Sequence, residues 1–212
     1  MADRIEFSTE DGSEIDKRIL FQAMELIMNN LKENMEHIDQ NFKYTEKFIN
    51  ILHDSLVNKR RFFLLASGRS AFILQCFATR LVHLGADVFF VTNMATLPKL
   101  RKKDILIVLS GSGTTSIVVS LLKNYVNTVK PHAIICITSH PSSIIGRVGD
   151  VTIKILGRSK RDHSDDTHAV LTPEGTQFEQ IAFTYLDAVI AELAVKMGKT
   201  NDDLLKNHSS CN

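Results

Sequence analysis

A run of six small polar residues is the part of the sequence best suited to bind a charged ligand. Residues 110–115 read Ser-Gly-Ser-Gly-Thr-Thr and follow the apolar run 105–109 directly. Glycine lets the backbone come close to a ligand, and hydroxyl groups donate hydrogen bonds. A helix that begins after such a loop adds free N–H groups and partial positive charge. The pattern predicts a phosphate-binding loop whose members are Ser110, Gly111, Ser112, Gly113, Thr114 and Thr115.

Two nucleotide-binding motifs do not fit this loop. A P-loop needs Gly-Lys followed by Ser or Thr, and a dinucleotide fold needs three glycines at fixed spacing. Neither pattern occurs in residues 105–119. A turn that only caps the next helix is the alternative interpretation. Four hydroxyl side chains in six residues favour phosphate binding.

A similar loop lies upstream, after the apolar run 62–66. It contains Ser67, Gly68, Arg69 and Ser70, and a helical pattern follows at once. The guanidinium group of Arg69 could form a bidentate pair with a phosphate or hold a carboxylate. Because parallel strands present their carboxyl ends at one edge of a sheet, the two loops together predict one shared cleft.

Glu179 is the candidate general base. It lies in the first turn of the last long helix, where the helix dipole favours an ionised carboxylate, as a base at neutral pH requires. Thr176 precedes it by three residues, so a Thr-x-x-Glu capping box is the alternative. The residues alone leave both roles open.

The elements that must position these groups follow from hydrophobic periodicity. Five short apolar runs rich in Val, Ile and Phe predict buried strands, at residues 62–66, 88–91, 105–109, 133–137 and 151–155. Helical patterns lie between them, at residues 70–84 and 115–129, with a short helix expected at 142–149. Strands alternating with helices predict an α/β fold, with a parallel sheet covered on both faces.

Long helices flank this core at both ends of the chain. One is expected from Ile15 onwards and a second near residues 44–58; the apolar face of the first is broad enough to pack against a partner subunit, in a homodimer or homotetramer. The last long helix is expected at 177–197, ended by Gly198. Asn201 is expected to cap a short helix that leads towards His208.

These elements predict a single domain. Residues 1–13 are expected to be a flexible tail, and 14–212 one domain with N-terminal helices (14–58), a parallel α/β core (61–156), a loop (157–176) and C-terminal helices (177–208). The 212 residues are enough to bury a substantial core.

Composition and charge limit the kinds of molecule that the chain could bind and the compartment in which it could lie. The net charge is +1 and the basic clusters are short and scattered, which argues against a nucleic-acid partner. No apolar run approaches the roughly 18 residues that would span a bilayer. The three cysteines show no paired spacing, which favours a reducing, cytoplasmic compartment; they are Cys76, Cys136 and Cys211.

A polar stretch after residue 156 contains four side chains that could ligate a metal. They are His163, Asp165, Asp166 and His168. Their spacing matches no metal signature, so no metal site is predicted and the stretch is expected to be an exposed loop. His83, which lies among apolar residues at helical spacing, is expected to be a core or interface histidine.

Three segments resemble the signatures of SIS (sugar isomerase) domains. They are Gly-Arg-Ser at 68–70, the loop 110–115, and Thr-Pro-Glu-Gly-Thr-Gln-Phe-Glu at 172–179. Residues 76–85 and 186–192, with His208, are most similar to the 6-phospho-3-hexuloisomerases. The resemblance covers roughly residues 61–208. The sequence departs from that pattern at Ala71, Thr114 and Glu174.

The resemblance implies a fold and a reaction. The fold would be a three-layer α-β-α sandwich with a five-stranded parallel sheet, doubly wound as in flavodoxin. The reaction would interconvert a 3-keto hexulose 6-phosphate and fructose 6-phosphate through a cis-enediol, without a cofactor. Glu179 would be the base, and His208 would assist ring opening or proton transfer in its own or a neighbouring subunit's site. The alternatives are an isomerase of another phosphosugar, such as sedoheptulose 7-phosphate, and a non-catalytic sugar-phosphate sensor.

Overall fold

The computed structural model describes residues 12–92, 97–157 and 171–207, with side chains described from residue 18 onwards. Its centre is a sheet of five parallel strands in the order β2-β1-β3-β4-β5. The strands are β1 (Phe62–Leu65), β2 (Val88–Phe90), β3 (Ile105–Leu109), β4 (Ala133–Thr138) and β5 (Val151–Lys154). The predicted strands are confirmed, with small differences at their ends.

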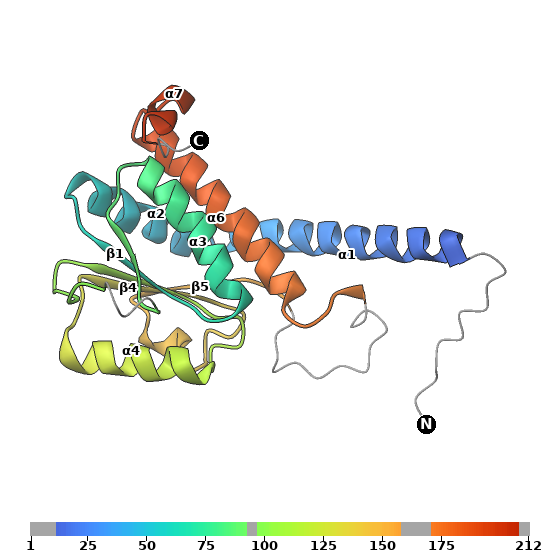
Figure 1. The fold of residues 1–212 in the computed structure, drawn as a ribbon, viewed down its shortest axis with the longest axis horizontal. Helices are drawn as coiled ribbons and strands as arrows, with labels where there is room; N and C mark the ends of the chain where they lie inside the picture. Colours follow the sequence, from blue (N-terminus) through green and yellow to red (C-terminus); the bar gives the residue numbers. More distant parts are fainter. Residues whose placement is uncertain (1–11, 93–96, 158–170, 208–212) are drawn as a thin grey trace.

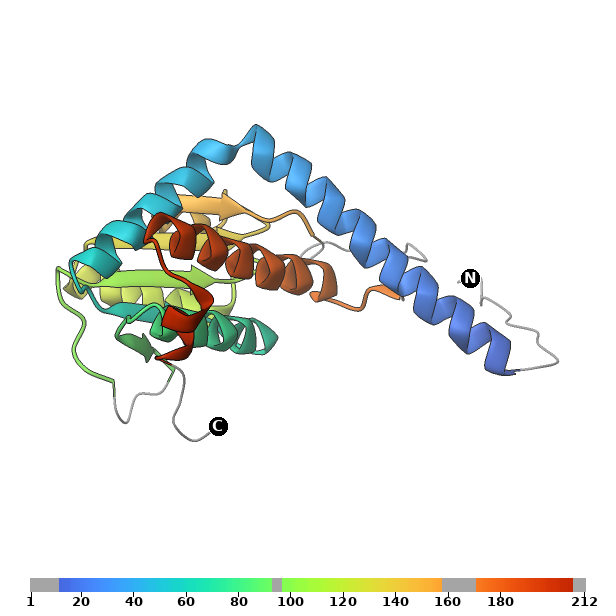
Figure 2. The same ribbon diagram turned by 90° about the horizontal axis from the view of Figure 1, so that it is seen from above.

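Helices cover both faces of the sheet. On one face lie α1 (Gly12–Gln40), α2 (Phe42–Val57), α3 (Arg69–His83) and α6 (Thr176–Lys196), and on the other lies α4 (Ser116–Thr128) (Figure 1). The three-layer α-β-α architecture is therefore confirmed. The amino-terminal half of α1 extends beyond the body of the domain (Figure 2).

The two faces explain why the central strands read as continuous apolar runs. Every residue of β3 is buried. Ile107 packs in the larger cluster, which contains Phe77 of α3 and Phe178 of α6, while Val108 packs in the cluster that contains Leu122 of α4. Since alternate side chains of a strand point to opposite faces, a strand covered on both sides has no polar position.

Two local predictions are wrong. The helix expected at 142–149 is only a short 3-10 turn, Gly146–Val148. The helix α7 (Asn201–Leu205) is capped by Thr200 and not by Asn201, because the Thr200 hydroxyl and the Asp203 side chain form a capping box. The expected end of α6 is confirmed, since Gly198 follows it with a φ of 62°.

No helix in the part of the chain that the structure describes is long and apolar enough to cross a membrane.

Candidate functional site

The strand order determines where a cleft can open. β1 and β3 are neighbours in the sheet, yet β1 leads into α3 on one face and β3 leads into α4 on the other. The loops that leave these two strands diverge to opposite faces, and the crevice between them is the usual ligand site of an open α/β sheet. The two predicted loops, which contain Ser67–Ser70 and Ser110–Thr115, lie at this point.

A cleft of about 700 Å³ lies at the carboxyl ends of β1 and β3. The start of α6 forms its third wall. Glu179 and all but one of the predicted phosphate-binding residues line it; these are Ser67, Gly68, Arg69, Ser70, Ser110, Gly111, Ser112, Thr114 and Thr115. The sequence therefore correctly predicted that these residues lie together around one cleft. That they bind phosphate stays a prediction.

Hydrogen bonds between its own residues keep the loop 110–115 turned. The Ser110 and Thr115 hydroxyl oxygens lie 3.2 Å apart, and the Thr114 N–H donates to Ser112 Oγ at 3.3 Å. Thr115 is the N-cap of α4, and its side chain makes no capping hydrogen bond. The first turn of α4 contains no acidic residue, so its amino terminus can accept an anion.

Gly113 is the member of this loop that does not line the cleft. Its φ is 62°, and an added Cβ would lie 2.5 Å from Ser143 Cβ. Its carbonyl accepts a hydrogen bond from the Ile145 N–H at 3.1 Å. Gly113 thus fixes the shape of the loop against the segment after β4, and its contact with the ligand stays a prediction.

Gly111 connects the loop to its neighbours on two sides. Its carbonyl accepts hydrogen bonds from Thr138 Oγ1 and from the Ser139 N–H, each at 3.1 Å. An added Cβ at Gly111 would lie 3.0 Å from the ring of Phe178, so any larger residue would require the ring to shift. The loop from β3 is therefore hydrogen-bonded to the end of β4 and lies close to the start of α6.

Glu179 and Arg69 form an ion pair across the cleft. Arg69 Nε lies 2.6 Å from Glu179 Oε2; the Glu179 side chain is 12% exposed and that of Arg69 is 61% exposed. Arg69 is the only Lys or Arg among the described residues that line the cleft. Of the two partners predicted for Arg69, the structure contains the carboxylate.

The capping-box interpretation of Glu179 is wrong. Gly175, with a φ of 85°, is the N-cap of α6, so Thr176 is already the first helical residue. The N-cap forms no side-chain hydrogen bond. The carboxylate instead lies over the helix terminus, where an added Cβ on Gly175 would be 3.3 Å from Glu179 Oε1. The positive end of the α6 dipole and Arg69 both favour its ionised form.

Sequence reasoning missed several lining residues. They are Leu109, Ser116, Glu174, Gly175 and Phe178. Ser116 continues the hydroxyl run of the loop, which was a usable signal. Glu174 adds a second carboxylate to the cleft. Phe178 lines the cleft because of the orientation of the first turn of α6, which tertiary packing sets and the sequence does not reveal.

Some predicted groups lie outside the described residues. These are His208, Cys211 and the polar stretch with His163, Asp165, Asp166 and His168. Within the ranges that the structure describes, no group of three His, Cys, Asp or Glu side chains could hold a metal ion.

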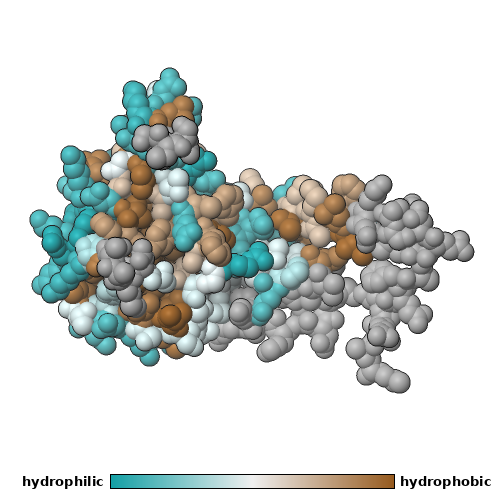
Figure 3. Space-filling model, in the orientation of Figure 1, coloured by the Kyte–Doolittle hydropathy of each residue, from teal (hydrophilic) through white to brown (hydrophobic). Residues whose placement is uncertain are grey.

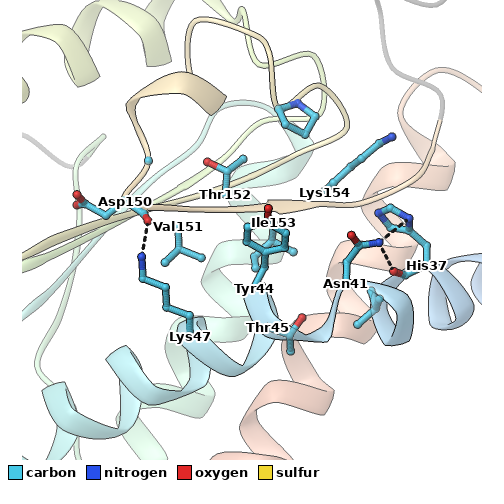
Figure 4. A pocket seen from close by; sticks show the side chains of 13 residues that line it. His37, Asn41, Tyr44, Thr45, Lys47, Asp150, Val151, Thr152, Ile153 and Lys154 are labelled. Carbon is cyan, nitrogen blue, oxygen red and sulfur yellow. Dashed lines mark hydrogen bonds between the residues drawn. The ribbon is translucent and has the colours of Figure 1, made fainter.

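A second pocket, of about 420 Å³, lies between β5 and the junction of α1 and α2 (Figure 4). Lys47 Nζ donates to the Asp150 carbonyl at 3.0 Å, and Asn41 Nδ2 donates to the His37 carbonyl at 2.8 Å. Burial and the nearby Lys154 lower the pKa of His37 below its usual value. This pocket contains none of the predicted ligand-binding residues, so the cleft between the loops is the candidate site.

Comparison with known proteins gives a consistent result. The SIS domain family model matches residues 55–171. The 3-hexulose-6-phosphate isomerase of Bacillus subtilis is 32% identical over 160 residues, which cover 75% of this chain and 84% of that protein. The 3-hexulose-6-phosphate isomerase of Methanocaldococcus jannaschii is 30% identical over 189 residues, which cover 85% and 97%.

A solved structure agrees with these sequence matches. The crystal structure of the protein MJ1247 from Methanococcus jannaschii has a TM-score of 0.73 and 30% sequence identity, covering 90% of this chain and 99% of that one. That structure is described as inferring a molecular function of 3-hexulose-6-phosphate isomerase.

Proposed function

Since the chain belongs to the SIS domain family, we propose that this phosphosugar isomerase interconverts a 3-keto hexulose 6-phosphate and fructose 6-phosphate. One observation carries the proposal. The carboxylate of Glu179 lies in the same cleft as the loop 110–115 and is held at 2.6 Å by Arg69. A phosphate on the loop would bring the carbons of a bound sugar within reach of a fixed base.

The phosphate would bind without a dedicated positive side chain in the loop. Hydroxyl groups of Ser110, Ser112 and Thr115 and the free N–H groups at the start of α4 supply the donors. Arg69 is the one cationic side chain among the described lining residues, and it faces the carboxylate. The hydroxyl and N–H groups would therefore bind the phosphate, and the guanidinium group of Arg69 would lie beside the reacting carbons.

Glu179 would move one proton between adjacent carbons. It would remove the proton from C2 of the 3-keto sugar, which leaves a cis-enediol across C2 and C3. Return of that proton to C3, with transfer of the hydroxyl proton from O2 to O3, places the ketone at C2. No atom or electron is gained or lost. Arg69 would stabilise the negative charge that develops on the enediol oxygens.

Two alternatives share this cleft. Other phosphosugars would place the same phosphate on the loop, and a relative named arabinose 5-phosphate isomerase is 30% identical over 138 residues. A non-catalytic sugar-phosphate sensor would need the loop but not the base. The ion pair between Glu179 and Arg69 favours an isomerase, because binding a phosphate does not require a fixed carboxylate beside it.

The experiment measures turnover and binding separately. Formation of fructose 6-phosphate is followed in a coupled assay, and binding is measured by calorimetry with each phosphosugar of a panel. We expect Glu179→Gln to lower kcat by 10²- to 10⁴-fold, because a general base contributes that much. Phosphosugar affinity should change only a few-fold. Glu46→Gln, an exposed site on α2, is the matched control.

Three other outcomes would each correct a different part of the proposal. Unchanged turnover in Glu179→Gln removes this residue from the role of base. Turnover of a different phosphosugar in the panel corrects the substrate, and binding without turnover across the panel identifies a sensor.

A further inference from the structure

Glu174 lies in a tight turn that directly precedes α6 and lines the cleft. The Thr176 N–H donates to the Pro173 carbonyl at 2.9 Å, so Glu174 and Gly175 are the two central residues of this turn. Gly175 has a φ of 85° and a ψ of −16°, which are the values that a type II turn requires at its third position. The backbone therefore fixes the point on the cleft wall from which the Glu174 side chain extends.

The side chains that line the cleft carry one negative charge in excess. Among the described lining residues only Arg69, Glu174 and Glu179 are charged, and the loop 110–115 contains none of them. Arg69 and Glu179 form the ion pair at 2.6 Å and largely neutralise each other. Glu174 forms no ion pair with another residue that the structure describes, so its charge remains.

This charge lies on the wall that α6 provides. An added Cβ on Gly175, the residue after Glu174, would be 3.3 Å from Glu179 Oε1, so the two carboxylates belong to the same wall. Glu174 is exposed, and hydrophilic residues gather over the start of α6 in the space-filling view (Figure 3). The other wall, at loop 110–115, offers hydroxyl groups and the amino terminus of α4. The cleft is therefore suited to an anion at one wall and repels an anion at the other.

A phosphosugar bound in this cleft would experience both walls. With its phosphate on loop 110–115, the remote end of the sugar faces the wall that contains Glu174. The cleft volume of about 700 Å³ is in the range of pockets for drug-sized ligands, so size alone does not exclude a larger sugar derivative. An unpaired charge placed against an unwanted ligand is a common means of specificity.

We propose that Glu174 is a specificity residue, which excludes phosphosugars that carry a second anionic group at the end remote from the phosphate. The excluded ligands are sugar bisphosphates and phosphorylated sugar acids. A cationic group at the same end is attracted by the same carboxylate. This role rests on the proposed function, because it requires a phosphate on loop 110–115.

The test uses three open-chain ligands that differ only at C1. They are glucitol 6-phosphate, 6-phosphogluconate and 1-amino-1-deoxyglucitol 6-phosphate, whose C1 groups are neutral, anionic and cationic. None contains an aldehyde or a ketone, so binding is measured without turnover. Calorimetry gives the dissociation constant of each ligand for wild type and for Glu174→Gln, at neutral pH. Arg69 and Glu179 contribute equally to both proteins, so the change between them isolates Glu174.

Glu174→Gln should shift the two charged ligands in opposite directions. Relative to the neutral ligand, we expect the anionic one to bind about 3- to 5-fold more tightly and the cationic one about 3- to 5-fold more weakly, because the carboxylate is exposed. Glu174→Lys doubles the change in charge, so each factor should rise to about 10- to 25-fold. Salt at about 1 M should reduce these factors, since it screens exposed charges.

Glu192→Gln is the matched control. It removes the same charge from an exposed position on α6, about 24 Å along the helix from Thr176. Because the Debye length at 0.1 M salt is about 10 Å, this variant should leave all three affinities unchanged.

Two results would overturn the role of Glu174. One is unchanged relative affinities in Glu174→Gln, and the other is a shift of all three ligands in the same direction, which a change in the shape of the turn would cause. Failure of the proposed function gives a different result. Opposite shifts without formation of fructose 6-phosphate would support charge selection and exclude the isomerisation, whereas turnover with unchanged relative affinities would do the reverse. If none of the three ligands binds to wild type, both proposals are wrong.

Discussion

Replacing Gly113 with alanine tests how the phosphate loop is held in shape. Gly113 and Gly198, the residue that ends α6, have the same positive φ of 62°. They differ in surroundings. An added Cβ at Gly198 meets no atom within 4 Å, whereas at Gly113 it would overlap Ser143 Oγ and lie 2.5 Å from Ser143 Cβ. The pair of variants separates backbone strain from steric overlap.

The expected cost follows from these distances. A left-handed conformation costs an alanine about 1–2 kcal/mol, which is all that we expect for Gly198→Ala. At Gly113, rotating the Ser143 hydroxyl away would break its hydrogen bond with the Gly146 N–H, at a cost of about 1 kcal/mol. Rotation leaves the Cβ overlap, and such overpacking costs about 1–3 kcal/mol more. We therefore expect Gly113→Ala to lower the free energy of unfolding by about 3–6 kcal/mol.

A double-mutant cycle checks the cause. Ser143→Gly removes both overlapping atoms, so Gly113→Ala in that background should cost only about as much as Gly198→Ala. The coupling energy should be about 2–4 kcal/mol, measured by urea unfolding. The reasoning is refuted if Gly113→Ala costs no more than Gly198→Ala, or if Ser143→Gly does not reduce its cost.

Two further predictions concern buried groups away from the loop. Asp104 receives Arg61 Nε at 3.0 Å and Arg61 Nη2 at 2.6 Å, so Asp104→Asn should lower the free energy of unfolding by about 2–3 kcal/mol in urea. Its KM should not change, because Asp104 lies at the amino end of β3, opposite the cleft; a raised KM would contradict this. Burial, and secondarily Asp150, raises the pKa of the Cys136 thiol from about 9 to about 12. Since the unfolded thiol loses its proton first, stability should fall as pH rises from about 9 to 12. Cys136→Ala should flatten that fall in pH-dependent thermal unfolding, and an equal fall in both proteins would exclude this thiol as the cause.

Much of the fold could be predicted from local patterns. Runs such as 105–109 are continuous and apolar because β3 is covered on both faces, and that cause is visible in sequence. The loops at 67–70 and 110–115 were recognisable because glycine and hydroxyl residues directly follow a buried strand. Local patterns failed where two neighbouring residues could each have the same structural role. Thr200 and Asn201 can both cap a helix, and only the geometry decides that Thr200 does.

The sequence by itself determined which residues could bind a phosphate and which carboxylate could act as a base. The tertiary structure decided which of them meet. Arg69 and Glu179 form an ion pair although 110 positions separate them, because β1 lies beside β3 and α3 packs on α6. The close approach of Gly113 to Ser143 likewise depends on the segment after β4 lying beside the loop. Contacts between distant segments depend on strand order and helix packing, and no pattern within a short window of sequence contains that information.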